Sequence, residues 1–137
     1  MANSDGIRWQ QRLENFGKAL AQLDGATRLA SYSELELAGL VKMFEFSFEL
    51  AWKTCKDLLF HGGIDAASPR EAIRQAFEAG YLEEKDAETL LDGLDQRNLL
   101  THTYDAKAAR QAGDLIKNRY APALRRVYER LERKRAS

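Results

Sequence analysis

The chain has 137 residues, of which 45% are hydrophobic and 31% charged, and its 21 basic and 21 acidic residues leave no formal net charge. This balance predicts one ordered globular domain over residues 1–137 and disfavours a broadly basic nucleic-acid binder, so DNA binding is not expected. No apolar run approaches the roughly 18 residues of a membrane span. The start of the chain lacks the features of a signal peptide, and the single cysteine, Cys55, excludes an intrachain disulfide. We therefore expect a soluble cytoplasmic protein without membrane contact.

The neutral total conceals an uneven distribution of charge. Residues 118–137 hold seven basic and two acidic residues, whereas the remaining 117 residues hold 14 basic and 19 acidic residues. Basic residues near the end of a helix stabilise the negative end of its dipole. They also attract RNA phosphates or an acidic partner. We favour the first interpretation, because charged helix tails are common.

The first half of the chain predicts two long amphipathic helices. Apolar residues recur at steps of three and four over residues 7–23, at Trp9, Leu13, Phe16, Leu20 and Leu23. Ser33 and Glu36 form a capping box, in which each side chain satisfies a free backbone amide of the other residue. This box predicts the start of a helix over residues 34–60, which Gly62 and Gly63 then end.

The second half of the chain also predicts helices, over residues 69–79, 84–100 and 106–134. Ser68 and Asp105 are the expected N-caps of the first and the last of these helices. Gly80 should end the short helix, and Phe77 should face inward from it. Pro122 should kink the last helix, because proline removes one backbone hydrogen bond.

The expected fold is all-α, with a four-helix up-down bundle core and one additional short helix. No internal repeat or linker interrupts the chain. The apolar stripes are rich in aromatic residues for a small bundle. Part of this surface is therefore expected to face a second copy of the chain in a homodimer.

Several catalytic motifs are missing from the sequence. It has no glycine-rich phosphate loop, no pair of histidines at helical spacing and no serine-nucleophile signature. It also lacks the Gly-Ser and paired carboxylates of a nucleotidyltransferase active site. We therefore expect neither a metal nor a cofactor.

One stretch, residues 95–105, gathers arginine, asparagine, histidine and tyrosine where one helix ends and the next begins. A loop held between rigid helices is a common place for a functional site. Taken singly, Arg97 is a helix-end ion-pair partner, His102 a cap of the last carbonyls and Tyr104 a half-buried core residue. Together they form the pattern Arg-x4-His-x-Tyr, which competes with these separate interpretations.

A second segment, residues 44–54, has the sequence Phe-Glu-Phe-Ser-Phe-Glu-Leu-Ala-Trp-Lys-Thr. Together with Arg97, Asn98 and the spacing to His102 and Tyr104, it resembles the nucleotidyltransferase substrate-binding protein family, a subgroup of HEPN-domain proteins. The Arg-x4-His-x-Tyr pattern is similar to the signature of HEPN toxins encoded beside a minimal nucleotidyltransferase (MNT) antitoxin. The resemblance covers about residues 9–130.

The resemblance implies a five-helix, bundle-based fold, a homodimer and a cognate MNT partner. It also implies one of two functions. The first is a metal-independent endoribonuclease toxin with RNA as its substrate, and the second is a non-catalytic substrate-binding subunit of a two-component nucleotidyltransferase. In toxins with this motif the partner adenylylates the motif tyrosine, which corresponds here to Tyr104.

The side chains of the motif suit metal-free RNA cleavage, which needs a proton acceptor, a proton donor and a cation near the developing charge. His102 has a reference pKa of about 6.5 and can serve in either proton role. Arg97 can hold a phosphate bidentately, and Asn98 can hydrogen-bond the RNA or orient the histidine. One chain offers only one such histidine and arginine, so a dimer that joins both motifs in one cleft would be chemically relevant.

Three charged residues of the long helix, Glu45, Glu49 and Lys53, are spaced four apart and share one helix face. A solvated charge ladder is one interpretation, and a polar edge of the cleft that orients Arg97 is the other. We favour the ladder slightly. Trp52 and Phe48 continue the apolar stripe, so we assign them to the core or the dimer interface rather than to base stacking.

Overall fold

The structure is a computed structural model that describes residues 4–97 and 105–137. These ranges contain helices and no strand, which confirms the all-α prediction. None of the described helices is long and apolar enough to cross a membrane. The elements are α1 (Ser4–Ala26), α2 (Glu34–His61), α3 (Pro69–Glu78), α4 (Glu84–Asp95), α6 (Ala106–Leu115), the π-helical turn η1 (Ile116–Tyr120) and α7 (Ala121–Ala136).

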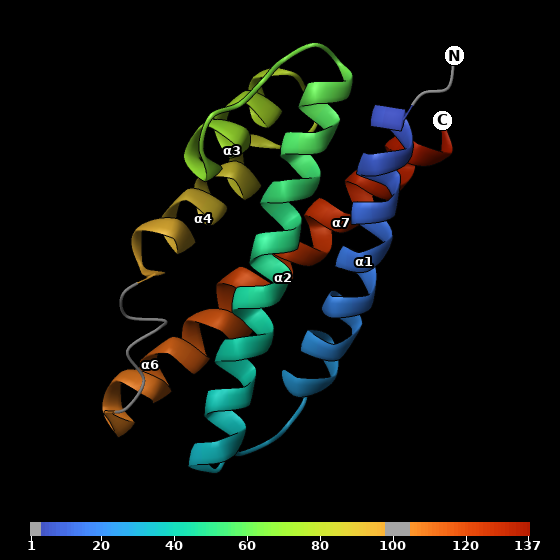
Figure 1. Cartoon of the computed structure of the whole chain (residues 1–137). Coiled ribbons are helices and arrows are strands. Elements are labelled where there is room, and N and C mark those ends of the chain that lie inside the picture. The colour runs from blue at the N-terminus through green and yellow to red at the C-terminus, as the bar shows by residue number, and fades with distance from the viewer. Residues whose placement is uncertain (1–3, 98–104) are drawn as a thin grey trace.

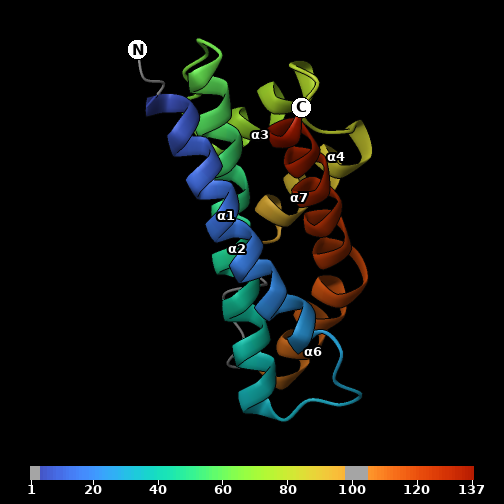
Figure 2. The same ribbon diagram turned by 90° about the vertical axis from the view of Figure 1, so that its right-hand side faces the viewer.

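The helices pack as a bundle (Figure 1). α1 and α2 lie side by side and run in opposite directions, while α6, η1 and α7 form one long rod that crosses α2. α3 and α4 pack at the end of the bundle where α2 finishes. Figure 2 shows that α7 returns alongside α1, and α7 also contacts α4. α4 is therefore placed mainly by α3 on one side and by the last helix on the other.

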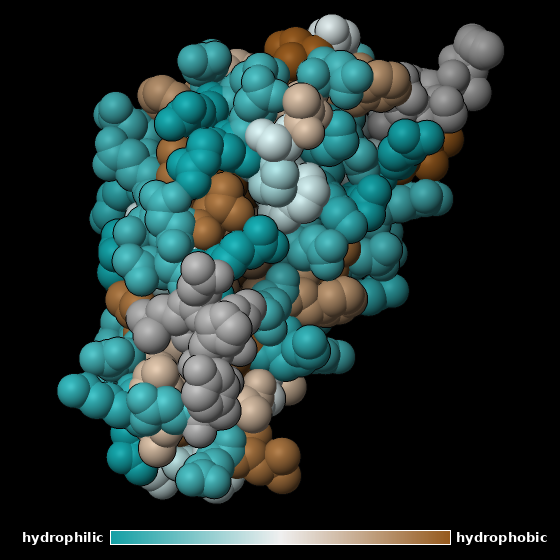
Figure 3. All heavy atoms as spheres, turned by 60° about the vertical axis from the view of Figure 1, so that its left-hand side comes forward, coloured by the Kyte–Doolittle hydropathy of each residue, from teal (hydrophilic) through white to brown (hydrophobic). Residues whose placement is uncertain are grey.

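Apolar residues at steps of three and four predict a buried stripe on the last helix as well as on the first, and both stripes are confirmed, because all of their residues are buried. They are Trp9, Leu13, Phe16, Leu20 and Leu23 in α1, and Ala109, Ala112, Ile116, Tyr120, Leu124, Val127 and Leu131 in the last three elements. Phe48 and Trp52 of α2 are half-buried and pack against this core. The face over α3, α4 and α6 is mostly hydrophilic, with small separate apolar patches (Figure 3).

The prediction for Phe77 is wrong, because its side chain is 38% exposed. α3 buries Ala72, Ile73 and Ala76 instead. A helix of three turns presents one narrow stripe to its neighbours, and Phe77 lies at the edge of that stripe, above a shallow groove shared with Leu91 of α4.

The predicted caps are formed by local hydrogen bonds. Ser33 and Glu36 make both bonds of the capping box, at 3.1 and 2.8 Å. Ser68 Oγ and the Asp105 carboxylate each accept a backbone N–H of the following helix at 3.1 Å. Gly63, with φ of 92°, adopts the left-handed conformation expected where α2 ends, a backbone geometry that glycine adopts without strain.

Two helix predictions are corrected by the structure. α4 ends at Asp95 instead of residue 100, and the N–H of Gln96 closes its last turn on the Asp92 carbonyl at 2.9 Å. The kink expected at Pro122 takes the form of a π-helical turn directly before it, in which the Ala121 N–H reaches the Ile116 carbonyl. Proline has no backbone N–H to donate to a carbonyl of the preceding turn. A π-helical turn accommodates the missing hydrogen bond, because it shifts the hydrogen-bond register by one residue.

Candidate functional site

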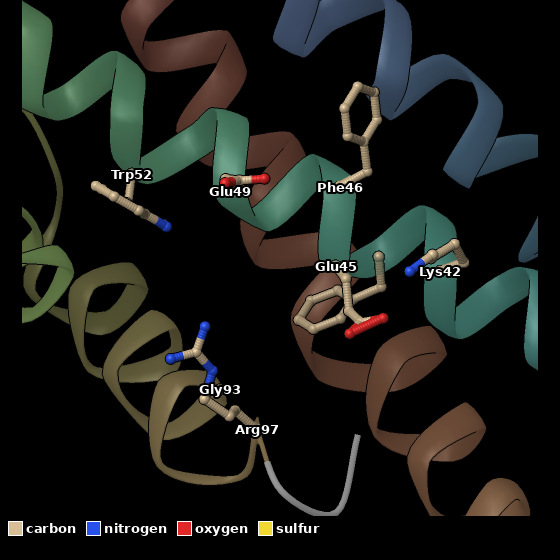
Figure 4. Close-up of a pocket in the computed structure, with 8 residues that line it drawn as sticks. Lys42, Glu45, Phe46, Glu49, Trp52, Gly93 and Arg97 are labelled. Atoms are coloured by element: carbon tan, nitrogen blue, oxygen red, sulfur yellow. The ribbon is translucent and has the colours of Figure 1, made fainter. Parts of the chain in front are cut away.

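A pocket of about 330 Å³ opens between α2 and the end of α4 (Figure 4). It brings together Glu45, Glu49 and Arg97, three of the residues that the sequence singled out. The complete lining is Lys42, Phe44, Glu45, Phe46, Glu49, Trp52, Gly93 and Arg97. Four of the six α2 residues, Lys42, Glu45, Glu49 and Trp52, are spaced three and four apart, so one side of a single helix forms most of the wall.

Arg97 lies just beyond the last turn of α4, and its side chain is exposed. Figure 4 shows it reaching from the end of α4 toward the side of α2 that carries Trp52 and Glu49. A guanidinium in this position presents fixed donors to a carboxylate, a phosphate or an aromatic face. The arginine is therefore accessible to a ligand that enters the pocket from solvent.

The two glutamates of the pocket differ in their surroundings. Lys53 Nζ lies 2.9 Å from Glu49 Oε1, so the charge of Glu49 is offset within α2. Lys53 also lies 5.8 Å from the centre of the Trp52 ring and is outside the set that lines the pocket. The i,i+4 ladder predicted for this face is present at this pair, while Glu45 is half-buried in the wall.

The floor of the pocket is aromatic and rigidly supported. Phe44 stacks on Tyr120, with ring centres 5.4 Å apart, and also contacts Phe48 at 5.5 Å. The Tyr120 hydroxyl donates a hydrogen bond to Asp92 at 2.7 Å. Burial, followed by this bond to a carboxylate, raises the pKa of Tyr120 well above its ordinary value.

Gly93 permits the close approach of α4 to this floor. A Cβ at this position would lie 3.3 Å from Phe48 and 3.6 Å from the Tyr120 ring. Gly93 precedes Arg97 by four residues, so the distance between α4 and α2 here determines how far the arginine lies from the α2 wall. The packing of Gly93 is thus part of the geometry of the site.

Three lining residues, Lys42, Phe46 and Gly93, were not anticipated from the sequence. Lys42 and Phe46 lie seven and three residues before Glu49, so a helical face drawn through the glutamates would have included them. No local signal marks Gly93, because its role depends on the packing of α4 against α2. Trp52, assigned to the core, packs against the core and also lines the pocket.

The other three residues of the predicted site, Asn98, His102 and Tyr104, lie outside the described residues. Within the described parts of the chain, no group of three or more His, Cys, Asp or Glu side chains could hold a metal ion.

Comparison with known proteins places the chain in a family. The model of the family described as nucleotidyltransferase substrate binding protein like matches residues 11–133. The crystal structure of ttk003001694 from Thermus thermophilus is similar in fold, with a TM-score of 0.75 and 31% sequence identity over 89% of this chain and 99% of that one. No curated protein matches the chain. The motif around Trp52 and the one that begins at Arg97 therefore indicated the family correctly, and the chain belongs to the nucleotidyltransferase substrate binding protein-like family.

Proposed function

We propose that this chain is the HEPN toxin of a toxin–antitoxin module, a metal-independent endoribonuclease that a partner MNT neutralises by adenylylating Tyr104. The observation that carries the proposal is the position of Arg97, exposed at the mouth of an open pocket with an aromatic floor. An arginine accessible to solvent can bind an RNA phosphate and stabilise the charge that develops during cleavage. Membership of the family supports a nucleotidyltransferase as partner.

The proposed reaction uses the ribose 2′-hydroxyl as nucleophile. Its oxygen attacks the adjacent phosphorus while one His102 accepts its proton. The bond from phosphorus to the 5′-oxygen breaks, and that oxygen takes a proton from the partner subunit's His102. The products are a 2′,3′-cyclic phosphate and a 5′-hydroxyl. Arg97 stabilises the phosphorane, and Asn98 orients the RNA or the histidine.

The homodimer is part of the proposal, because one chain contributes a single histidine. Leu35, Phe46 and Phe60 lie on one outer face of α2 and are exposed, with Phe46 at 57%. The Phe46 ring points away from Arg97 (Figure 4), so it is free to enter an interface beside the pocket. Sedimentation that shows a monomer at micromolar concentration would contradict both the dimer and the shared site.

Control through Tyr104 follows from the same chemistry. The tyrosine oxygen attacks the α-phosphorus of an ATP molecule held by the MNT, loses its proton and releases pyrophosphate. The attached AMP adds bulk and negative charge beside the motif, where the RNA phosphate would otherwise bind. Cleavage is then blocked while the chain stays folded.

The test is expression of the chain alone and together with the nucleotidyltransferase encoded beside it. Alone, the wild type should arrest growth, and with the partner its intact mass should increase by one or more AMP groups. Tyr104→Phe should lack the added mass and remain toxic in the presence of the partner. An unmodified Tyr104 in a fully neutralised complex would instead favour inhibition by simple occlusion.

The alternative function is a non-catalytic substrate-binding subunit, and the two carboxylates beside Trp52 in the pocket favour it. Glu45, Glu49 and Trp52 together suit a positively charged organic substrate, through charge attraction and contact with the aromatic face. Under this alternative, expression alone leaves growth unaffected. In that case Glu45→Gln should weaken the activity of the partner nucleotidyltransferase on its substrate. If the chain is instead a ribonuclease, Glu45→Gln should leave the transfer of the nucleotide to Tyr104 by the partner unchanged.

A further inference from the structure

A second pocket, whose lining is cationic and not balanced in charge, lies at the other end of α4. It encloses about 250 Å³ between the α3–α4 turn and the last turns of α7. Its lining is Gly80, Tyr81, Arg130, Arg133 and Lys134, and we call it the cation pocket. Three of these five residues are cations and none is acidic, whereas the lining of the Arg97 pocket has two cations and two glutamates.

Most of the other basic residues of α7 are neutralised by ion pairs. Arg125 pairs with Asp24 of α1, Arg126 donates to Asp86 of α4 at 2.8 Å, and Arg135 pairs with Glu132 on its own helix. The pairs with Asp24 and Asp86 hold α7 in the bundle, and the pair with Glu132 lies within α7.

The cations of the cation pocket are held differently. Arg130 donates to the Gly80 carbonyl at 3.1 Å and lies 3.9 Å from Glu83, at the limit of an ion pair. Among the described residues, Arg133 and Lys134 have no carboxylate within ion-pair distance. Both are exposed, so their charge is directed to solvent. The positive charge of the tail therefore remains uncompensated mainly at this pocket.

An aromatic ring completes the cation pocket. Lys134 Nζ lies 5.0 Å from the centre of the Tyr81 ring. The turn that carries Tyr81 is preformed, because Gly80 has φ of 86° and the Tyr81 N–H donates to the Ala76 carbonyl at 2.8 Å. A cationic groove with an aromatic side chain is the combination that binds single-stranded nucleic acids without sequence preference.

We infer that the cation pocket binds the phosphate backbone of single-stranded RNA, as a second contact outside the Arg97 pocket. The choice of RNA rests on the proposed function. α4 has 12 residues and is about 18 Å long, at 1.5 Å per residue. The cation pocket is therefore separated from Arg97 by at least the length of this helix, so it is a contact distinct from the Arg97 pocket.

The test measures binding to a fluorescent single-stranded RNA in which every ribose is 2′-O-methylated. This probe lacks the nucleophile for cleavage, so binding is read independently of catalysis. The double variant Arg133→Ala/Lys134→Ala should bind about tenfold more weakly. The slope of log affinity against log salt should fall by about 1.4, because each lost phosphate contact of a single strand removes about 0.7.

Two matched variants sharpen the result. Arg135→Ala removes a cation of the same tail that is paired with Glu132 and lies outside the pocket, so it should bind nearly as the wild type does. Glu83→Gln removes the carboxylate that lies 3.9 Å from Arg130 and should strengthen binding about twofold. Glu83 makes no side-chain capping bond to α4, so this change leaves the helix start intact.

Equal affinity of the wild type and the double variant would overturn the inference. It would also be overturned if Arg97→Ala lost RNA binding while the double variant kept it. Binding of an acidic partner protein at these cations, with RNA binding unaffected, would overturn it as well. If the wild type binds the methylated RNA through the cation pocket but cleaves no RNA, the proposed ribonuclease activity is refuted. The inference that the cation pocket binds RNA is then still supported.

Discussion

The two ends of α4 are attached to the last helix in the same way but face different electrostatic surroundings. In the first turn, Asp86 is 3% exposed and accepts a hydrogen bond from Arg126 of α7. In the last turn, Asp92 accepts hydrogen bonds from Arg119 at 2.8 Å and from Tyr120 at 2.7 Å. An acidic residue of α4 thus holds each end against the same long rod.

Beyond these attachments the surroundings differ. The start of α4 adjoins the cation pocket, where Arg133 and Lys134 lack carboxylate partners, and its end leads to Arg97, which shares a pocket with Glu45 and Glu49. Positive charge without a nearby carboxylate attracts an anion from solvent but orients it weakly. An arginine that shares a pocket with carboxylates attracts an anion less strongly, but its planar guanidinium can bind a phosphate in a defined geometry. The comparison predicts that one end contributes affinity and the other contributes chemistry.

The largest effect is expected from Arg97→Ala. If the arginine stabilises the phosphorane, RNA cleavage should fall by about 10²–10³-fold, as for the loss of one preorganised donor to a developing charge. Arg97→Lys should recover little, because lysine cannot reproduce bidentate binding. Cleavage of a labelled RNA by purified protein measures both variants.

Arg70→Ala is the matched control for this change. Arg70 pairs with Asp95 at the same end of α4, is partly exposed and does not line the pocket, so cleavage should stay close to wild type. Full cleavage by Arg97→Ala would contradict the division of roles between the two ends of α4.

Arg126→Ala tests the attachment at the start of α4. It leaves the carboxylate of Asp86 buried without its donor, which should lower the free energy of unfolding by about 1–3 kcal/mol. Arg135→Ala, which removes a more exposed pair on the same helix, should change it by less than about 1 kcal/mol. Urea unfolding followed by circular dichroism measures both values, and equal stabilities would show that the attachment is unimportant.

Gly93→Ala tests the packing at the end of α4. The new methyl group would lie 3.3 Å from Phe48, so overpacking should exceed the gain in helix propensity and give a net loss of about 1 kcal/mol. Gly39→Ala in α2 has nothing within 4 Å of its Cβ and should stabilise by up to about 1 kcal/mol. Thermal unfolding separates the two, and stabilisation by both would contradict the close approach at Gly93.

The smallest effect concerns alkaline pH and the attachment at Asp92. The raised pKa of Tyr120 means that its contribution to stability is complete below the ordinary tyrosine pKa of about 10 and decreases as pH rises further. The free energy of unfolding of Tyr120→Phe should therefore decrease less with rising pH than that of the wild type. At pH 10.5 the tyrosine should account for a loss of less than about 1 kcal/mol in the free energy of unfolding. Urea unfolding from pH 8 to pH 11 should show this as a divergence that begins near the ordinary tyrosine pKa.

Cys55 must be separated from this effect. Burial raises the pKa of its thiol to about 12, so it also lowers stability as pH rises from its unperturbed value toward 12. Cys55→Ala in both backgrounds removes this contribution. A Tyr120→Phe variant that still followed the wild-type pH dependence would show that the tyrosine is not coupled to folding.

The parts of the fold that were predicted correctly depend on neighbours in the chain. The capping box at Ser33, the N-cap at Asp105 and the left-handed glycine after α2 are decided by bonds that span a few residues. The exposure of Phe77 and the end of α4 at Asp95 were not foreseen. Both depend on how neighbouring helices cover a short one, which periodicity alone does not specify.

The sequence by itself determined the helices, the buried stripes of α1 and α7 and the family, and it gave a cleft edge beside Arg97 as the second interpretation of Glu45 and Glu49. Each of these follows from short-range spacing or from a contiguous motif. Only the tertiary structure decided that Gly93 sets the distance between α4 and α2, and which cations of the tail are neutralised. Arg125 and Arg126 find carboxylates 101 and 40 residues away in the chain, whereas Arg133 and Lys134 meet Tyr81. Pairing over such separations depends on the packing of whole helices, so a count of charges along the sequence cannot locate where the excess remains.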